Sequence, residues 1–287
     1  MRKLKEFLIE KIILICGLAS IFFVVLIFLF LMKEGLAVFS SVAPVKFLFG
    51  KSWYPISEPA QLGILPLILG SLLVTLGAAV ISIPIGVACA VYIAEIAPLR
   101  IKEVLKSGIE MLAAIPSVVL GFIGMVTLVP WIKSVFHLPT GLTALSGSVM
   151  LAFMAMPTIV SIAEDALYSV PKSYKAGALA LGATHWQTIY RVILPAASSG
   201  ILAAVMLGLG RVIGETMAVM MITGNAAVMP QSILQPIRTL TATIAAEMGE
   251  AVVGSEHYFA LFAIGIVLFV ISFIINVTAD LFLHKRQ

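Results

Sequence analysis

Long apolar runs dominate this sequence and leave few folds open to it. A helix needs about 20 apolar residues to cross the roughly 30 Å hydrocarbon core of a bilayer. With 61% hydrophobic and 11% charged residues, the chain has too few charges to cover a soluble globule of its size. We therefore expect an all-α, polytopic membrane protein with six transmembrane helices: Ile12–Met32, Gly63–Ala94, Ile109–Ile132, Ala144–Ala163, Ala197–Ile222 and Tyr258–Phe282.

The first run differs from a cleaved signal peptide in its length. It spans 21 residues, Ile12–Met32, whereas the apolar part of a signal peptide spans about 7–15. We therefore expect it to be retained as a membrane helix. The second run is longer than one crossing needs, and Pro66 and Pro84 indicate that it starts outside the bilayer or is tilted and kinked.

The basic residues are distributed unevenly between the two sides of the expected bundle. The side of the N-terminus carries 12 Lys and Arg, and the other side carries 5. Positively charged loops stay in the cytoplasm, so this asymmetry predicts a multi-pass protein of the plasma membrane with both termini cytoplasmic. The net charge of +4 is spread over the ends of apolar runs and does not indicate nucleic-acid binding.

The runs divide the chain into three parts. Residues 1–62 are expected to form the first helix and an outer loop, residues 63–282 a core of five transmembrane helices, and residues 283–287 a cytoplasmic tail. Within the core, the cytoplasmic loop 164–196 is rich in Ala and Leu, unlike an ordinary connector. Its acidic start, Glu164 and Asp165, is expected to be a solvated helix end.

This loop predicts two short helices with a sharp turn between them. Pro171 can start the first helix and Gly182 can end it. Thr184 and Gln187 have the spacing of a capping box, which predicts the start of the second helix, and Pro195 follows its end. The hairpin either links two spans at the membrane surface or forms a docking element for a cytoplasmic partner.

Motifs for catalysis are not found in this sequence. Gly50-Lys51-Ser52 resembles the end of a phosphate-binding loop, but Val45 stands where that motif needs glycine. The four histidines have no metal-ligand spacing, and no nucleophile, histidine and carboxylate stand together. We therefore expect a chain that is not an enzyme and holds no metal or cofactor of its own.

The amino-acid sequence of the cytoplasmic loop resembles the EAA signature of permease subunits of ABC importers. That pattern runs Glu-Ala-Ala, three residues, Gly, nine residues, then Ile-x-Leu-Pro. The spacing from Gly182 to Pro195 fits it, while Ala176 and Gly177 replace its Glu and first Ala. The resemblance implies that the hairpin sits in a cleft of an ATPase subunit through Ala176, Gly177, Ala178, Leu181, Gly182 and Ala183.

Further sequence segments resemble the phosphate-specific permeases of the PstC type, and they are spread over most of the chain: Phe47–Pro55, Ile115–Val119, Met156–Ile159, Glu164–Leu167, Gly210–Val219 and Leu240–Ala251. The resemblance implies a permease of type I ABC importer architecture that forms the translocation pathway for inorganic phosphate with a PstA-like sister permease. Two copies of a PstB-like ATPase, which bind ATP and Mg²⁺, and a PstS-like phosphate-binding protein are the further partners implied. Membrane lipid is expected to surround the assembly.

Arg211 is the one basic residue that falls inside an apolar run. Glu215 follows at the spacing of one helical turn, so a continuous helix would place both on one face. A charge at the bilayer centre costs about 2.5–3.5 kcal/mol, and such residues usually face a bundle interior or a cavity. The two residues either form a packing pair or line a cavity in which Arg211 attracts an oxyanion. Other residues expected along this pathway are Thr216, and Ser117 and Thr158, which each follow a proline.

Other functions compete with a phosphate importer. A permease for another oxyanion, such as sulfate or molybdate, would need a similar chain, because these anions have similar shapes. A stand-alone ion-coupled transporter predicts an inverted repeat and several intramembrane ionisable groups, and neither stands out in the sequence. A membrane enzyme would need a convergent catalytic set.

Overall fold

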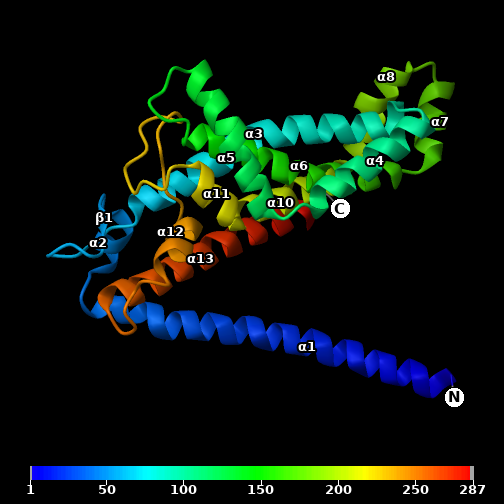
Figure 1. Cartoon of the computed structure of the whole chain (residues 1–287). Coiled ribbons are helices and arrows are strands. Elements are labelled where there is room, and N and C mark those ends of the chain that lie inside the picture. The colour runs from blue at the N-terminus through cyan, green and yellow to red at the C-terminus, as the bar shows by residue number, and fades with distance from the viewer. Residues whose placement is uncertain (1, 285–287) are drawn as a thin grey trace.

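The computed structural model describes residues 2–284 of the chain, so Lys285 and Arg286 of the expected tail lie outside the described residues. The described chain is mostly helical (Figure 1). Its elements before the core are α1 (Arg2–Gly35), η1 (Leu36–Ser40), α2 (Pro44–Phe49), β1 (Trp53–Tyr54) and β2 (Gln61–Leu62). The two short strands form an antiparallel hairpin in which Trp53 pairs with Leu62.

The core elements follow in chain order: α3 (Leu65–Val91), η2 (Tyr92–Ile96), α4 (Leu99–Ala114), α5 (Ser117–Val135), α6 (Ala144–Tyr168), α7 (Lys172–Ala180), α8 (His185–Thr188), η3 (Ile189–Ile193), α9 (Leu194–Ala196), α10 (Ser198–Gly214), α11 (Met217–Ile222), α12 (Leu240–Glu247) and α13 (Glu256–His284). Both η2 and η3 are π-helical turns. Thr143 caps the start of α6 and Thr239 that of α12 by accepting backbone N–H groups.

Helix α6 is the centre of the bundle, between α3 and α10. Ile159 of α6 is fully buried and contacts both neighbours. A Cβ placed on Gly86 of α3 would lie 2.9 Å from Ile159 Cγ2, and one on Gly208 of α10 would clash with the same side chain. Glycines at these two positions therefore let three helices approach closely, as small residues do in membrane bundles.

Helix α1 stands apart from this core and contacts α13 near its C-terminal end (Figure 1). The rings of Phe30 and Phe262 lie 5.5 Å apart, and those of Phe28 and Phe269 lie 5.0 Å apart. In the most apolar stretch of this first span, no residue is buried by the rest of the described chain. Such an apolar surface requires lipid or another apolar partner around it.

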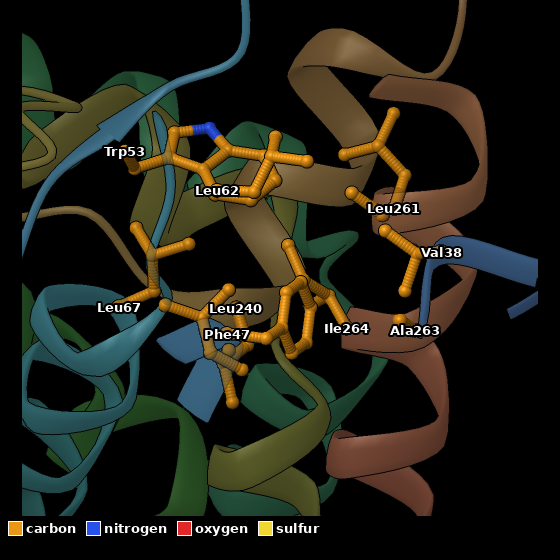
Figure 2. Close-up of a cluster of buried hydrophobic side chains, with 11 residues drawn as sticks. Val38, Phe47, Trp53, Leu62, Leu67, Leu240, Leu261, Ala263 and Ile264 are labelled. Atoms are coloured by element: carbon orange, nitrogen blue, oxygen red, sulfur yellow. The ribbon is translucent and has the colours of Figure 1, made fainter. Parts of the chain in front are cut away.

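A compact apolar cluster joins the start of α13 to the segment between α1 and α3. Figure 2 shows Phe47, Trp53, Leu62, Leu240 and Ile264 directed toward one another from four parts of the chain. Phe47 and Ile264 are fully buried. This cluster holds the β-hairpin end of the bundle, which lies opposite α7 and α8 in Figure 1.

Five described helical segments are long and apolar enough to cross a membrane, and a sixth crossing is possible if the bent pair His185–Ala196 and Ser198–Gly214 is one span. The expected first and fourth runs lie within such segments; the second starts two residues before its segment, Leu65–Ile96, and the sixth ends four residues after its segment, Glu256–Thr278. Between His185–Ala196 and Ser198–Gly214 the helix axis bends by 69°. The prediction of an all-α membrane protein is thus confirmed, and four of its six expected runs each correspond to one such segment.

Two expected runs are divided in the structure. The third, Ile109–Ile132, contains the end of α4 and most of α5, because Ile115 is extended (φ −69°, ψ 128°) before Pro116. A residue before proline is driven out of the helical region. The spanning helix therefore begins at Ser117, and Pro116 separates two helices instead of kinking one. The fifth run, Ala197–Ile222, is divided at Glu215 and Thr216.

Candidate functional site

The break between α10 and α11 lies inside the fifth apolar run. Glu215 is extended (φ −69°, ψ 131°), so α10 ends at Gly214 and the six-residue α11 starts at Met217. Broken helices at membrane depth occur where the backbone is buried in protein or lines a cavity. A Cβ on Gly210 or Gly214 would meet no atom of the described chain within 4 Å. The break therefore lies beside unfilled space.

Arg211 is in the last turn of α10 and is half-buried. Its Nη1 lies 3.5 Å from Thr158 Oγ1 of α6, at the limit of a hydrogen bond. The structure thus brings together two residues expected along the pathway that are 53 positions apart. A single long hydroxyl contact leaves most of the five guanidinium N–H groups of Arg211 free of hydrogen bonds to the described protein.

Glu215 does not pair with Arg211 among the ion pairs of the described residues. The expectation that both lie on one face of a continuous helix is wrong, because the helix ends between them. Instead, Glu215 Oε1 accepts a hydrogen bond of 3.2 Å from the backbone N–H of Ala218 in α11. The carboxylate thereby satisfies a free donor at the start of that helix. Thr216, next in the chain, donates to the carbonyl of Gly214 at 3.1 Å.

Thr241 is a residue of this region that sequence reasoning missed. Its Oγ1 donates to the carbonyl of Glu215 at 3.0 Å and so links α12 to the break. Thr241 is largely buried, 8% exposed, as are its neighbours Thr239 and Thr243. The alternation Thr239-x-Thr241-x-Thr243 in an otherwise apolar stretch was the available signal.

Ser117 begins α5, one turn before Gly121. A Cβ on Gly121 would lie 2.9 Å from Ala218 Cα, so α5 packs tightly on the start of α11. Among the hydrogen bonds of the described residues, none joins Ser117 to Arg211 or Thr158. Ser117 is therefore one turn from the packing of α5 on α11, without a hydrogen bond to the arginine among the described residues.

The segment after α6 forms the expected pair of short helices. Gly182 has φ +84°, a conformation that costs glycine little and other residues more. The N–H of Gly182 bonds to the carbonyl of Leu179 at 3.0 Å and that of Ala183 to Ala178 at 3.1 Å, which is a Schellman ending for α7. The predicted capping box of Thr184 and Gln187 is present.

The tip of this hairpin is strongly exposed. The Leu181 side chain is 91% exposed and Trp186 is 65% exposed. No residue of α7 is buried, so Ala176, Gly177 and Ala178 have little packing within the chain. Exposed apolar side chains in a tight, well-capped turn are typical of a surface that binds another protein.

Glu164 lies near the start of this segment and is buried, not a solvated helix end. Its carboxylate pairs with Lys102 and Lys106 of α4, both at 2.8 Å. The hydrogen bond to Glu164 raises the pKa of the Lys106 ammonium above its ordinary value, although burial acts in the opposite direction. Both cations therefore tie α4 to the end of α6, while Asp165 stays largely exposed.

A second polar centre lies at the opposite end of the bundle. The carboxylate of Glu247, in α12, accepts hydrogen bonds from Trp53 Nε1 at 3.0 and 3.2 Å and contacts His257 Nε2 at 2.9 Å. It also pairs with the guanidinium of Arg238, which donates to the carbonyl of Asn225 at 3.0 Å. One carboxylate thus joins the β-hairpin, the segment before α12, α12 itself and the first turn of α13.

Residues 82–286 match the family described as "Binding-protein-dependent transport system inner membrane component". The chain belongs to this family. Its permease relatives include "Probable ABC transporter permease protein YqgH" of Bacillus subtilis (strain 168), which is 43% identical over 275 residues, or 95% of this chain and 89% of the relative. "Phosphate transport system permease protein PstC" of Mesorhizobium japonicum is 35% identical over 258 residues, or 83% of this chain and 78% of the relative.

A solved permease has the same fold. One chain of the MetNI methionine ABC transporter in an inward-facing conformation superposes with a TM-score of 0.63 at 18% identity, covering 81% of this chain and all of that one. The expected permease architecture of this binding-protein-dependent transport family is therefore confirmed. The chain is a multi-pass membrane permease of PstC type.

Proposed function

We propose that this chain is the membrane permease subunit of an ATP-driven importer of inorganic phosphate. Together with a PstA-like sister permease it forms the translocation pathway, and it carries no catalytic centre or cofactor of its own. A PstB-like ATPase dimer binds ATP and Mg²⁺ and docks on α7 and α8. A PstS-like binding protein delivers phosphate to the side of the β-hairpin.

The position of Arg211 is the observation that supports an oxyanion as the substrate. Its guanidinium sits beside a break in a membrane helix, with a hydroxyl of Thr158 as a weak partner. An arginine with free donors can hold phosphate oxygens in bidentate fashion. Among the oxyanions, the relatives named as phosphate permeases support phosphate as the substrate.

The partners follow from the family and from the hairpin of α7 and α8. Members of the family are described as components of binding-protein-dependent transport systems, which supports a soluble binding protein as one partner. The exposed, rigidly capped turn at Gly182 supports an ATPase as another. The most apolar stretch of α1, of which no residue is buried in the chain, supports contact with lipid or with the sister permease.

Competition among oxyanions tests the substrate. Proteoliposomes that hold the four-component complex are expected to take up radioactive phosphate at an unchanged rate in a tenfold excess of sulfate or molybdate. Arsenate, which matches phosphate in shape and protonation, is expected to compete. Inhibition by sulfate or molybdate with none by arsenate would assign the chain to another oxyanion.

Cysteine labelling tests the orientation in the membrane. The first residues of α1 and the last of α13 lie toward the same end of the bundle as α7 and α8 (Figure 1). The asymmetry of basic residues supports a cytoplasmic position for that end. In a chain without Cys16 and Cys89, a membrane-impermeant reagent added outside should label Ser52→Cys and Ser255→Cys. Ser173→Cys should react after permeabilisation alone, and its labelling in intact cells would overturn the orientation.

Replacing Gly182 by valine tests the docking role of the hairpin. A β-branched residue at φ +84° is strained, whereas no described atom lies within 4 Å of the added Cβ. The turn should therefore distort while the chain still inserts, and copurification of the ATPase should fall. Gly108→Val is the matched control, because Gly108 is in α4, outside the hairpin, and has open space around it. Full copurification and transport by Gly182→Val would contradict the assignment.

A further inference from the structure

Helix α7 is weakly embedded in the protein that it is proposed to move. None of its residues is buried, and Leu179 is 44% exposed. On one side it joins α6 through a short extended turn at Pro171, and on the other it ends at the turn of Gly182. A helix with so little packing needs another link if its movement is to reach the spanning helices.

An ion pair supplies such a link. Lys175 Nζ of α7 lies 2.6 Å from Glu95 Oε2, and the two side chains are 37% and 11% exposed. Glu95 belongs to η2, which continues α3 without a break to Ile96. The ion pair therefore joins the exposed hairpin to one of the longest helical segments of the core.

Glu95 is unusual for its segment. It is the one charged residue among the 32 residues of Leu65–Ile96. It lies in a π-helical turn, a local widening of the helix that often marks functional positions. A carboxylate that is mostly removed from water is costly unless it is paired. These features are accounted for if the position of Glu95 is fixed by its partner on α7.

The surroundings of the pair strengthen it and leave room for movement. Lys175 and Glu95 line a hollow between α7 and the ends of α3 and α6, whose other walls are mostly apolar: Ala94, Leu167, Val170, Leu179 and Ile193. Apolar walls lower the local dielectric constant and raise the attraction between the charges. The hollow itself provides no tight packing that could replace the ion pair.

We propose that Lys175 and Glu95 are positioning residues that transmit the movement of α7 to α3 during ATP-driven transport. The inference rests on the proposed docking of an ATPase at the hairpin. When the ATPase displaces α7, the ion pair carries η2 and the end of α3 with it. Without the pair, the hairpin would move on its own and hydrolysis would proceed with little transport.

Charge reversal tests the pair in the reconstituted complex. The measured quantity is the number of phosphate ions transported per ATP hydrolysed, with ATPase copurification measured in parallel. Lys175→Glu and Glu95→Lys are each expected to lower this ratio by about fivefold or more, the low end of typical coupling between sites. Copurification should stay unchanged. The combined swap is expected to recover most of the ratio, because the charges are again opposite.

The matched control is Lys172→Glu, which changes the charge of α7 by the same amount. Lys172 lines the same hollow but has no ion pair among the described residues, so its variant should keep the wild-type ratio. If charge reversal prevents assembly, Lys175→Met and Glu95→Gln remove the charges with little change in size and are measured in the same way.

Two results would overturn the proposal. One is a wild-type ratio in both single variants of an intact complex, and the other is a combined swap that transports no better than the single variants. A wild-type complex that hydrolyses ATP without moving phosphate would instead contradict the proposed function. The two failures are therefore distinguishable in one experiment.

Discussion

Replacing Arg211 by glutamine is expected to lower phosphate uptake by at least about tenfold, because a hydrogen bond to a charged group contributes about 1.5–3 kcal/mol. Assembly and ATP hydrolysis should persist, since Arg211 has no ion-pair partner among the described residues that its loss would leave unpaired. Uptake by proteoliposomes and ATPase activity of the same preparation are the measurements. Arg211→Lys, which keeps the charge, should retain part of the uptake.

Glu215→Gln is the matched control for Arg211→Gln. The amide oxygen of glutamine can still accept the N–H of Ala218, so the start of α11 should be preserved and uptake should change little. The double variant should be as impaired as Arg211→Gln alone, because the two charges do not pair. Near-normal uptake by an assembled double variant would contradict the role of Arg211 in the pathway and favour a packing role.

Replacing Glu247 by leucine is expected to destabilise the protein by about 3 kcal/mol, the cost of leaving the partner of a largely buried ion pair uncompensated. The carboxylate and the Arg238 side chain are 16% and 18% exposed, and the same carboxylate also accepts from Trp53 and contacts His257. Thermal unfolding of the purified chain in detergent, followed by tryptophan fluorescence, should show a lowered midpoint.

Glu250→Leu is the control for this change. Glu250 lines the same hollow near the β-hairpin but is exposed and has no ion pair among the described residues. Its variant should unfold at the wild-type midpoint. If Glu247→Leu unfolds at the same temperature as Glu250→Leu, the four chain segments at this end are held together by the apolar cluster alone.

The sequence was sufficient to predict most of the helices and the hairpin of α7 and α8, because both depend on local signals. Apolar length determines which segments can span a bilayer, and the ending at Gly182 and the capping box at Thr184 depend on a few neighbouring residues. The separation of α4 from α5 also had a local signal, since Ile115 precedes Pro116.

The break at Glu215 could not be predicted from hydropathy. The run through Ala197–Ile222 is apolar on both sides, and the break depends on contacts from elsewhere: the Thr241 hydroxyl on the Glu215 carbonyl and the Glu215 carboxylate on α11. Tertiary contacts of this kind can override a local helical pattern. The polar cluster around Glu247 could not be predicted from the sequence for the same reason, because Trp53 and Glu247 are 194 residues apart.

ATP-driven uptake of phosphate by a complex built on this chain tests the proposed function most directly. The chain, a PstA-like permease and a PstB-like ATPase are reconstituted in proteoliposomes, and a phosphate-loaded PstS-like protein is added on the side of the β-hairpin. Accumulation of phosphate that requires hydrolysable ATP and stops when this chain is left out is the predicted result. Phosphate accumulation without ATP or without the ATPase, at the rate of the complete system, would contradict it and indicate a transporter that acts alone.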